Sequence, residues 1–398
     1  SLTTGQRLTA VGGQAADALT TGNDVTAVGY AAYSGGTTAS HNTAVGAYSM
    51  DAGVTGEYNT AIGRDALGAL TSGQYCSGLG AYALWSNTTG EYNTAVGGNS
   101  MFDNTTGSYN TSVGHEALAN NTTGSQNVAV GRHAMYTNTT ASDNTAVGYR
   151  ALYTNTTATD CTAVGYKALD NSNANNCTAV GENCLSANTT GDVNTAVGQR
   201  ALLSCTTGRI NTAFGGNAMD GLTTGENNTA IGYEAGDAVT TGSNNVFVGF
   251  YAGRSQGNTT NLLYIARSNT DAGNAATWIH GQSTGACVQG NNSTTWNTTS
   301  DVRLKKNISD SPKGLAEINK LRVTNFEYKR EDEIDMSEFP LADGPHQVCL
   351  NDETKEGVTQ TGVIAQEVES VLPECINTSH RGAKTVNSDA IMWAMVNA

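Results

Sequence analysis

Residues 93–109 read NTAVGGNSMFDNTTGSY, and close variants of this stretch recur along the first two thirds of the chain. The Gly of the TAVG core returns every 17 residues, with a single 16-residue step between two of the copies. A fixed period of this kind is the signature of repeat proteins, in which each repeat forms one coil stacked on its neighbours. The fifteen core glycines are Gly12, Gly29, Gly46, Gly63, Gly80, Gly97, Gly114, Gly131, Gly148, Gly165, Gly181, Gly198, Gly215, Gly232 and Gly249.

Each position of the repeat has its own residue type. A large apolar residue precedes the Gly, Ala usually stands two places before it, and Asn is common four places before and seven places after it. Because Thr and Val alternate with Gly and no 3.6-residue period is present, the pattern predicts two short strands per coil, joined by Gly and Asn turns. We expect the Gly at positive φ or at a close backbone contact, and Asn ladders between coils. Fifteen coils at the strand spacing of about 4.8 Å give a shaft roughly 70 Å long.

The Ala two places before each core Gly forms a column along the stacked coils, and this Ala column indicates how the coils contact other chains. Neighbouring residues of a strand face opposite ways, so the Ala column points away from the large apolar column. It stays small and apolar through fifteen coils, and we therefore expect it to pack against another chain in an intertwined homotrimer. The alternative is a monomeric β-solenoid with an Ala-lined interior. Either way the fold class is mainly β, with a parallel β-solenoid or β-roll shaft of 17-residue period over residues 1–266. This repeat resembles the head repeats of trimeric autotransporter adhesins and related phage-fibre β-rolls.

The composition excludes several classes of protein. Of 398 residues 47 are Gly and only 4 are Pro, charged residues make up 14%, and the formal net charge is −15. A globular enzyme has about 25% charged residues, and collagen requires far more proline. An acidic chain without a cluster of Lys and Arg does not favour nucleic acid as a partner. The sequence has no run of 18 apolar residues, so we expect no insertion into a membrane.

The composition changes near residue 300. The last 99 residues hold 28 of the 55 charged residues, which is typical of ordinary globular protein. We therefore expect a β-rich neck over residues 267–299 and a small α+β domain over residues 300–398. In this domain the pattern predicts helices over 312–321, 365–372 and 390–398, and strands over 323–328 and 358–364.

A candidate catalytic pair opens the C-terminal domain, where residues 300–308 read SDVRLKKNI. Ser300 and Lys305 can act as nucleophile and base, provided that the Lys is neutral when it takes the proton. Burial lowers the pKa of a Lys enough for this role. Spacing alone, however, favours a surface Ser in front of a basic strand.

Several motifs of the C-terminal domain together resemble one family. SDVRLKKNI is followed in order by LRVTNFEY at 321–328, GVIAQEVE at 362–369, VLPE at 371–374 and KTVN at 384–387. This series resembles the C-terminal intramolecular chaperone of phage tail spikes and fibres, an endosialidase-type self-cleaving peptidase domain. The match covers essentially all of 300–398.

The resemblance implies a domain that folds as a trimer, templates the β-structure before it and then cuts itself off. It places the cleavage between Thr299 and Ser300, with Ser300 as the nucleophile and Lys305 as the base. This is a single-turnover serine peptidase, for which we expect no external substrate and no cofactor. The positions that match the family's motifs in supporting roles are Asp301, Arg303, Asn307, Gln366 and Glu367.

Other residues carry weaker signals. The eight Cys show no metal-ligand spacing, and five of them replace Asn or Ala in the repeat, so we interpret them as reduced thiols in small slots. Cys161 and Cys177 lie on adjacent coils, close enough for a disulfide in an oxidising environment. The six His are scattered, so we expect no metal. Tyr recurs in one slot at positions 58, 75, 92 and 109, which favours a structural Tyr ladder over a sugar-stacking stripe.

Together these features favour a phage tail fibre or receptor-binding structural protein, located in the tail appendage of the virion and assembled in the host cytoplasm. The expected partners are two further copies, a host cell-surface glycan or protein receptor, and other virion tail proteins reached through a missing N-terminal part. One alternative is a tail spike that degrades polysaccharide, but glycosidases need paired carboxylates, and shaft acids such as Asp65, Glu116 and Glu182 are scattered. Another alternative is a cellular trimeric adhesin.

Overall fold

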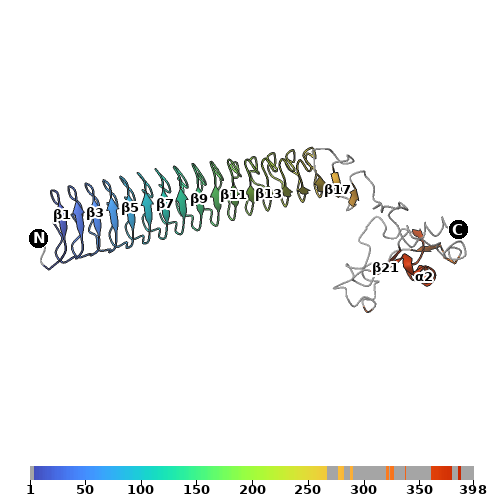
Figure 1. Ribbon diagram of the computed structural model, residues 1–398, viewed down its shortest axis with the longest axis horizontal. Coiled ribbons are helices and arrows are strands. Elements are labelled where there is room, and N and C mark those ends of the chain that lie inside the picture. Colours follow the sequence, from blue (N-terminus) through green and yellow to red (C-terminus); the bar gives the residue numbers. More distant parts are fainter. Residues whose placement is uncertain are drawn as a thin grey trace, which may run out of the picture. The chain divides into compact units, whose positions relative to one another are not determined.

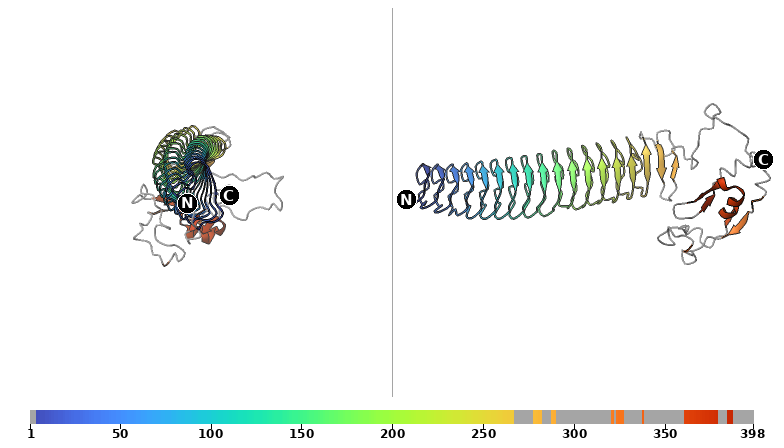
Figure 2. Two further views of the ribbon diagram at one scale, coloured as in Figure 1. Left: turned by 90° about the vertical axis from the view of Figure 1, so that its left-hand side faces the viewer. Right: turned by 60° about the horizontal axis from the view of Figure 1, so that its bottom comes forward.

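The computed structural model describes residues 4–266, 277–281, 287–289, 320–321, 323–326, 337, 360–378 and 384–386. The chain divides into two compact units, Ser1–Asn297 and Thr298–Ala398. The first unit is a β-solenoid, in which each coil of the repeat adds one strand to a single sheet (Figures 1 and 2).

The sheet of the solenoid is parallel and in register. Strands of successive coils pair so that Thr faces Thr and Ala faces Ala, as for Ala44 and Ala61. The predicted parallel β-solenoid with a 17-residue period is therefore confirmed. The strands are β1 (Thr9–Val11), β2 (Thr26–Val28), β3 (Thr43–Val45), β4 (Thr60–Ile62), β5 (Ser77–Leu79), β6 (Thr94–Val96), β7 (Thr111–Val113), β8 (Val128–Val130), β9 (Thr145–Val147), β10 (Thr162–Val164), β11 (Thr178–Val180), β12 (Thr195–Val197), β13 (Thr212–Phe214), β14 (Thr229–Ile231), β15 (Val246–Val248) and β16 (Leu263–Ala266).

The prediction of two strands per coil is wrong, because each coil from β1 to β15 has one three-residue strand followed by consecutive turns. The cause is the backbone after the core Gly, where residues two and four places on have left-handed φ angles. In one coil these are Asp65 (φ 55°) and Leu67 (φ 52°), and a left-handed residue cannot continue a strand. The turns still pair between coils, since the Leu67 amide donates to the carbonyl of Ala83 at 3.0 Å.

The core of the solenoid lies inside each coil, between the strand and the turns. Ala61 of the strand and Leu67 of the turn are both fully buried in one continuous cluster. Gly78 occupies the Ala slot of the next coil, and a Cβ added there would lie 3.5 Å from Leu67 Cγ. The Ala column therefore packs against the Leu and Met column of its own chain, since only a methyl group fits opposite the larger side chain. Our expectation that the Ala column faces another chain is wrong, and the Ala-lined interior of the alternative is what the structure has.

Two further predictions about the repeat are confirmed. The core Gly63 has a φ of 138°, and a Cβ added there would lie 2.5 Å from the carbonyl oxygen of Gly80. The Asn residues form buried ladders, as where Asn104 Nδ2 donates to Asn87 Oδ1 at 2.8 Å and Asn121 Nδ2 donates to Asn104 Oδ1 at 2.7 Å. Amides stacked at one strand spacing satisfy each other's donors and acceptors without water, which fixes the polar interior of the coil.

The shaft continues into two antiparallel strands. β17 (Thr277–Gly281) pairs with β16, and β18 (Cys287–Gln289) pairs with β17. Both strands fall in the segment predicted as a β-rich neck.

The second unit is of mixed type. β19 (Thr324–Phe326) and β20 (Gln360–Gly362) form an antiparallel pair, as do β21 (Ile376–Thr378) and β22 (Lys384–Val386). The helix α2 (Ala365–Val371) is followed by the 3-10 turn η5 (Pro373–Cys375). The two predicted strands and the helix that ends before Pro373 are confirmed. The strands β21 and β22 were not predicted, and the helices predicted over 312–321 and 390–398 lie outside the described residues.

At seven residues, α2 is far too short to cross a bilayer, and the described part of the chain contains no helix that could.

Candidate functional site

The predicted catalytic pair and most of its surroundings lie outside the described residues. These positions are Thr299, Ser300, Asp301, Arg303, Lys305 and Asn307. Their assigned roles therefore stay predictions. Two of the predicted supporting residues, Gln366 and Glu367, are described and lie in the first turn of α2.

The packing of α2 decides how these two residues are presented. Val368 and Leu372 are buried with Cys375 in a small core, to which Val363 and Val386 contribute. Because residues one and two places before Val368 fall on other faces of the helix, Gln366 is exposed and Glu367 is half-buried. The amides of Glu367 and Val368 both bond to the Ile364 carbonyl, each at 3.0 Å. α2 thus holds Gln366 and Glu367 at the edge of a small core rather than inside it.

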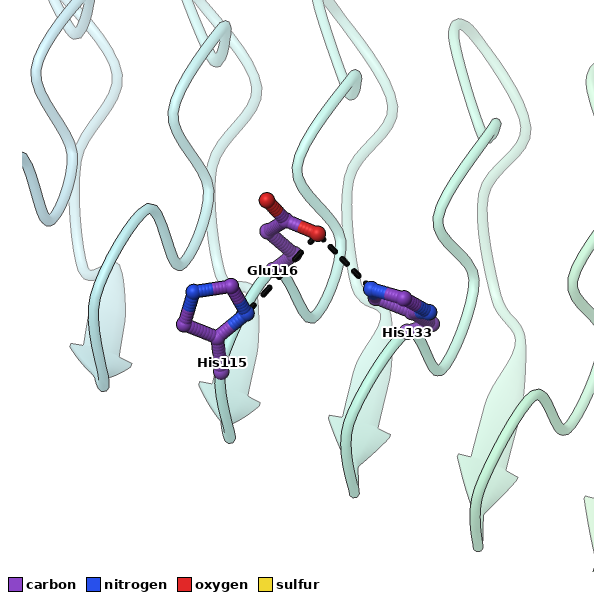
Figure 3. Close-up of side chains that lie close together, drawn as sticks. All are labelled: His115, Glu116 and His133. Atoms are coloured by element: carbon purple, nitrogen blue, oxygen red, sulfur yellow. Dashed lines mark hydrogen bonds and ion pairs between the residues drawn. The ribbon is translucent and has the colours of Figure 1, made fainter.

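A second group of chemically capable side chains lies on the shaft, at His115, Glu116 and His133 (Figure 3). His133 Nε2 lies 2.7 Å from Glu116 Oε2, and His115 Nδ1 lies 3.7 Å from the same oxygen. The six histidines are scattered along the sequence, and this group was not predicted. The signal was available, because Glu116 and His133 are 17 residues apart and therefore occupy the same slot on successive coils.

The acids of the shaft are mostly ion-paired or hydrogen-bonded. Asp65 pairs with Arg64 at 2.9 Å, Glu116 contacts His133, and Glu182 accepts a hydrogen bond from Gln199 at 3.0 Å. Asp65 and Glu116 are three coils apart, or about 14 Å. The carboxylates of a glycosidase are roughly 5 to 9.5 Å apart, so these three acids do not form such a pair.

Three other acids do come together near the end of the shaft. Arg254 Nε lies 3.0 Å from Glu234 Oε2 and 3.9 Å from Asp237 Oδ2, and Arg200 contacts Asp220 at 2.9 Å. Burial raises the pKa of Asp237, and the nearby Asp220 and Glu234 raise it further. The two arginines compensate most of the charge, and this group reads as an ion-pair network.

The Tyr slot forms a continuous ring stack, as predicted. Tyr58, Tyr75, Tyr92 and Tyr109 stack with ring centroids 4.9 to 5.0 Å apart and nearly parallel planes. His41 continues the stack on Tyr58 at 4.7 Å. Each ring covers the face of the next, so the faces inside the stack are not free to stack a sugar.

The shaft cysteines are buried thiols in small slots, as predicted. Cys76 takes an Asn position in the ladder, where its Sγ donates to the carbonyl of Gly90 at 3.2 Å. Cys161 and Cys177 are free thiols that donate to different carbonyls, those of Ala174 and Gly191. Burial raises the pKa of the Cys161 thiol to about 12, so it is protonated and unreactive at neutral pH.

Fold and site together define a shaft protein, in which a long repetitive rod precedes a small, separately folded C-terminal domain. Residues 300–377 match the family model described as the chaperone of endosialidase. Neither a curated protein nor a solved structure matches the chain. At the family level, a β-solenoid followed by this chaperone has the architecture of a phage tail fibre or tail spike, and the family implies self-cleavage.

Proposed function

We propose that the chain is the shaft of a phage tail fibre, whose C-terminal domain aligns three copies and then releases itself by cleavage between Thr299 and Ser300. The observation that carries the proposal is where the family match begins. It starts at Ser300, the residue that follows the predicted scissile bond, and close to the end of the first compact unit at Asn297.

The proposed cleavage needs one nucleophile and one base. The Ser300 hydroxyl attacks the carbonyl carbon of Thr299, while neutral Lys305 takes the hydroxyl proton. The bond from Thr299 to the Ser300 amide nitrogen breaks, and the nitrogen receives that proton from Lys305. The ester left between Thr299 and the Ser300 oxygen is then hydrolysed by water, which gives a shaft ending in a carboxylate and a fragment beginning with a free amine.

The repeat explains why such a shaft needs an aligning domain. Every coil presents the same residues in the same slots, as the in-register pairing of Ala44 with Ala61 shows. Copies shifted by one coil would therefore make nearly the same contacts, and local pairing cannot select the register. A domain that trimerises separately supplies the alignment, and its removal leaves the assembled fibre kinetically trapped.

The outer face of the shaft sheet is the surface that we propose for contact between the copies. From β1 to β16 its two outward slots hold only Thr, Ser, Val, Leu, Ile and Phe, so no charge interrupts it. Ile62, Phe214 and Ile231 are each more than 40% exposed in the single chain. An uncharged, partly apolar strip of this length is unusual for solvent-facing sheet. Two further copies of the chain are the occupants that fit its repeat.

A role as a fibre also implies further partners and a location for the protein. We propose that the shaft joins other virion tail proteins at one end, and that the fibre contacts a host cell-surface glycan or protein receptor. Assembly takes place in the host cytoplasm, and the mature location is the tail appendage.

Mass spectrometry of freshly expressed chain tests the cleavage. The unaltered chain is expected to yield a C-terminal fragment beginning at Ser300, whereas Ser300→Ala stays whole. Lys305→Met is also expected to stay whole. Lys306→Met is the matched control, because it removes the neighbouring positive charge and should still be cut. An intact unaltered chain, or cleavage that persists in Ser300→Ala, would rule the proposal out.

A further inference from the structure

The His115, Glu116 and His133 group is built by the stacking of coils. Glu116 and His133 each stand two places after a core Gly, and both have left-handed φ angles of 55° and 59°. Their side chains therefore leave successive coils in the same direction, one beside the other (Figure 3). The His133 amide donates to the His115 carbonyl at 3.2 Å, which ties the two coils together at this point.

The three donor atoms have nearly the spacing of metal ligands. All lie within 4.8 Å of one another, with 2.7 Å from Glu116 Oε2 to His133 Nε2 and 3.7 Å to His115 Nδ1. Bonds of about 2.0 to 2.1 Å in a tetrahedral site place ligand atoms about 3.3 Å apart. The two contacts of Glu116 Oε2 depart from this spacing by about 0.6 and 0.4 Å, so binding of an ion requires rotation of these side chains. His115 is the most exposed of the three, which leaves room for water as a fourth ligand.

We propose that His115, Glu116 and His133 bind a divalent transition-metal ion, for which Zn²⁺ is the best match. Two imidazole nitrogens and one carboxylate oxygen form a donor set that Zn²⁺ favours. Ca²⁺ and Mg²⁺ instead take mostly oxygen ligands in larger number. This site lies on the shaft, away from the self-cleavage chemistry in sequence.

Hydrogen bonding without metal accounts for only part of the arrangement. The 2.7 Å contact of His133 with Glu116 is a complete hydrogen bond by itself. It does not explain His115, whose Nδ1 is directed at the same oxygen at 3.7 Å, too far for a hydrogen bond. His133 is also held among aromatic rings, with the centroids of Tyr136 and Tyr153 at 5.3 and 6.2 Å, so it is ordered before any metal arrives.

A bound metal ion would cross-link two successive coils. It links the slot of Glu116 to the same slot one coil further on, so separating these coils requires releasing the ion. Binding to the folded shaft alone stabilises it in proportion to the logarithm of the free metal concentration. The structure thus points to a local, metal-dependent reinforcement of the rod.

Titration of the metal-free full chain with Zn²⁺ tests this proposal, with Ser300→Ala as the background so that the chain remains whole. We expect one ion per chain to be lost, or its affinity to fall at least tenfold, in Glu116→Gln and in His133→Gln. Glu116→Gln has nearly the same shape, so its fold is expected to survive, and circular dichroism checks this. Co²⁺ provides a second readout, because its visible spectrum reports tetrahedral coordination.

The matched control is His41→Gln. His41 Nδ1 lies 3.6 Å from Asp24 Oδ2, which gives a His–carboxylate pair on the same shaft without a third ligand among the described residues. Zn²⁺ affinity should not change in this variant. Equal affinity of the Ser300→Ala chain and its Glu116→Gln and His133→Gln derivatives, or binding only at millimolar Zn²⁺, would overturn the proposal.

Discussion

Single residues in this shaft adopt backbone conformations that most side chains avoid. The core glycines have φ angles between 118° and 139°, and their neighbours on the next coil leave no space for a Cβ. Leu67 and its equivalents are left-handed without being Gly, at a cost of order 1 kcal/mol or more each. Hydrogen bonds between coils, such as Leu67 to Ala83, and the burial of the Leu side chain offset this cost.

The first prediction concerns Gly63→Ala. The new Cβ would lie 2.5 Å from the Gly80 carbonyl oxygen in a backbone conformation unsuited to Ala, so we expect a local loss of about 2 to 4 kcal/mol. Hydrogen exchange around residues 60–80 and the thermal midpoint measure it. Gly53→Ala is the control, since its Cβ would meet nothing closer than 4.0 Å, and it should be nearly neutral. Equal effects of the two substitutions would show that close packing of the core Gly is not limiting.

At the residue scale, how well the sequence predicts the backbone conformation depends on the residue type. A Gly repeated in one slot predicts positive φ, and the structure confirms it. A Leu in one slot predicts burial but carries no signal for a left-handed backbone, because Leu rarely adopts one. The turn conformation of Leu67 results from the stacking of many coils, which a local pattern does not record. The same holds for the His115, Glu116 and His133 group, which is found only when residues are compared slot by slot.

At the level of elements, the alternating pattern of the repeat predicts a strand but does not show which of its two sides faces the core. Ala and the large apolar residue must face opposite sides of the strand. Which side is inside depends on the turn segment opposite, where Leu67 already fills the coil and leaves space only for Ala61. Three-residue strands offer too few positions to settle this from hydrophobicity alone, and the side that the Ala column faces was therefore predicted wrongly.

The Asn ladder forms buried side-chain hydrogen bonds between successive coils. Asn121 is fully buried, donates to Asn104 and to the Gly124 carbonyl, and accepts from Asn138 at 2.8 Å. Asn121→Ala leaves Asn104 Oδ1 without its donor, at about 1 to 3 kcal/mol. It also removes two hydrogen bonds worth about 0.5 to 1.5 kcal/mol each, although the Gly124 carbonyl still accepts from Asn110 and Asn138 Nδ2 still donates to the Ala141 carbonyl. We expect a total loss of about 2 to 6 kcal/mol, measured by hydrogen exchange of residues 104–138.

Asn121→Cys is the comparison for this ladder prediction. Cys205 occupies the equivalent slot in another coil, where its Sγ donates to the carbonyl of Gly208 at 3.5 Å. A thiol therefore replaces one of the amide's hydrogen bonds, and Asn121→Cys should cost less than Asn121→Ala. If Asn121→Ala proved neutral, the ladder would not contribute to the stability of the shaft.

For the molecule as a whole, the sequence contains two kinds of information, one about the shaft and one about the C-terminal domain. The period fixes a uniform rod, and the motifs from Ser300 onward match the chaperone of endosialidase. The proposed roles of Ser300 and Lys305 rest on their positions in the motif. The burial and the pKa of Lys305 depend on contacts that cannot be read from residue spacing. Because every coil presents nearly the same contacts, copies shifted by one coil would pair almost equally well, and the proposed alignment of three copies therefore relies on the non-repetitive domain.

The last prediction tests which face the copies share. In the released shaft of residues 1–299 we expect a mass of three chains by light scattering. Phe214→Asp places a carboxylate on the uncharged sheet face, where Phe214 is 46% exposed in the single chain. Burying that unpaired charge costs about 3 to 5 kcal/mol per chain, so the trimer should weaken or fail to form.

Leu203→Asp is the matched control for the shared face. Leu203 stands five places after a core Gly, a slot that holds Asp170, Asp220 and Asp237 in other coils, so a carboxylate is already tolerated there. The Leu203→Asp shaft should remain trimeric while the Phe214→Asp shaft does not. A monomeric unaltered shaft would refute the trimer itself. If Phe214→Asp leaves the trimer unchanged, the contact between copies lies on another face. The uncharged face would then need a different occupant, because a face that contacts only solvent is not expected to stay free of charged residues through fifteen coils.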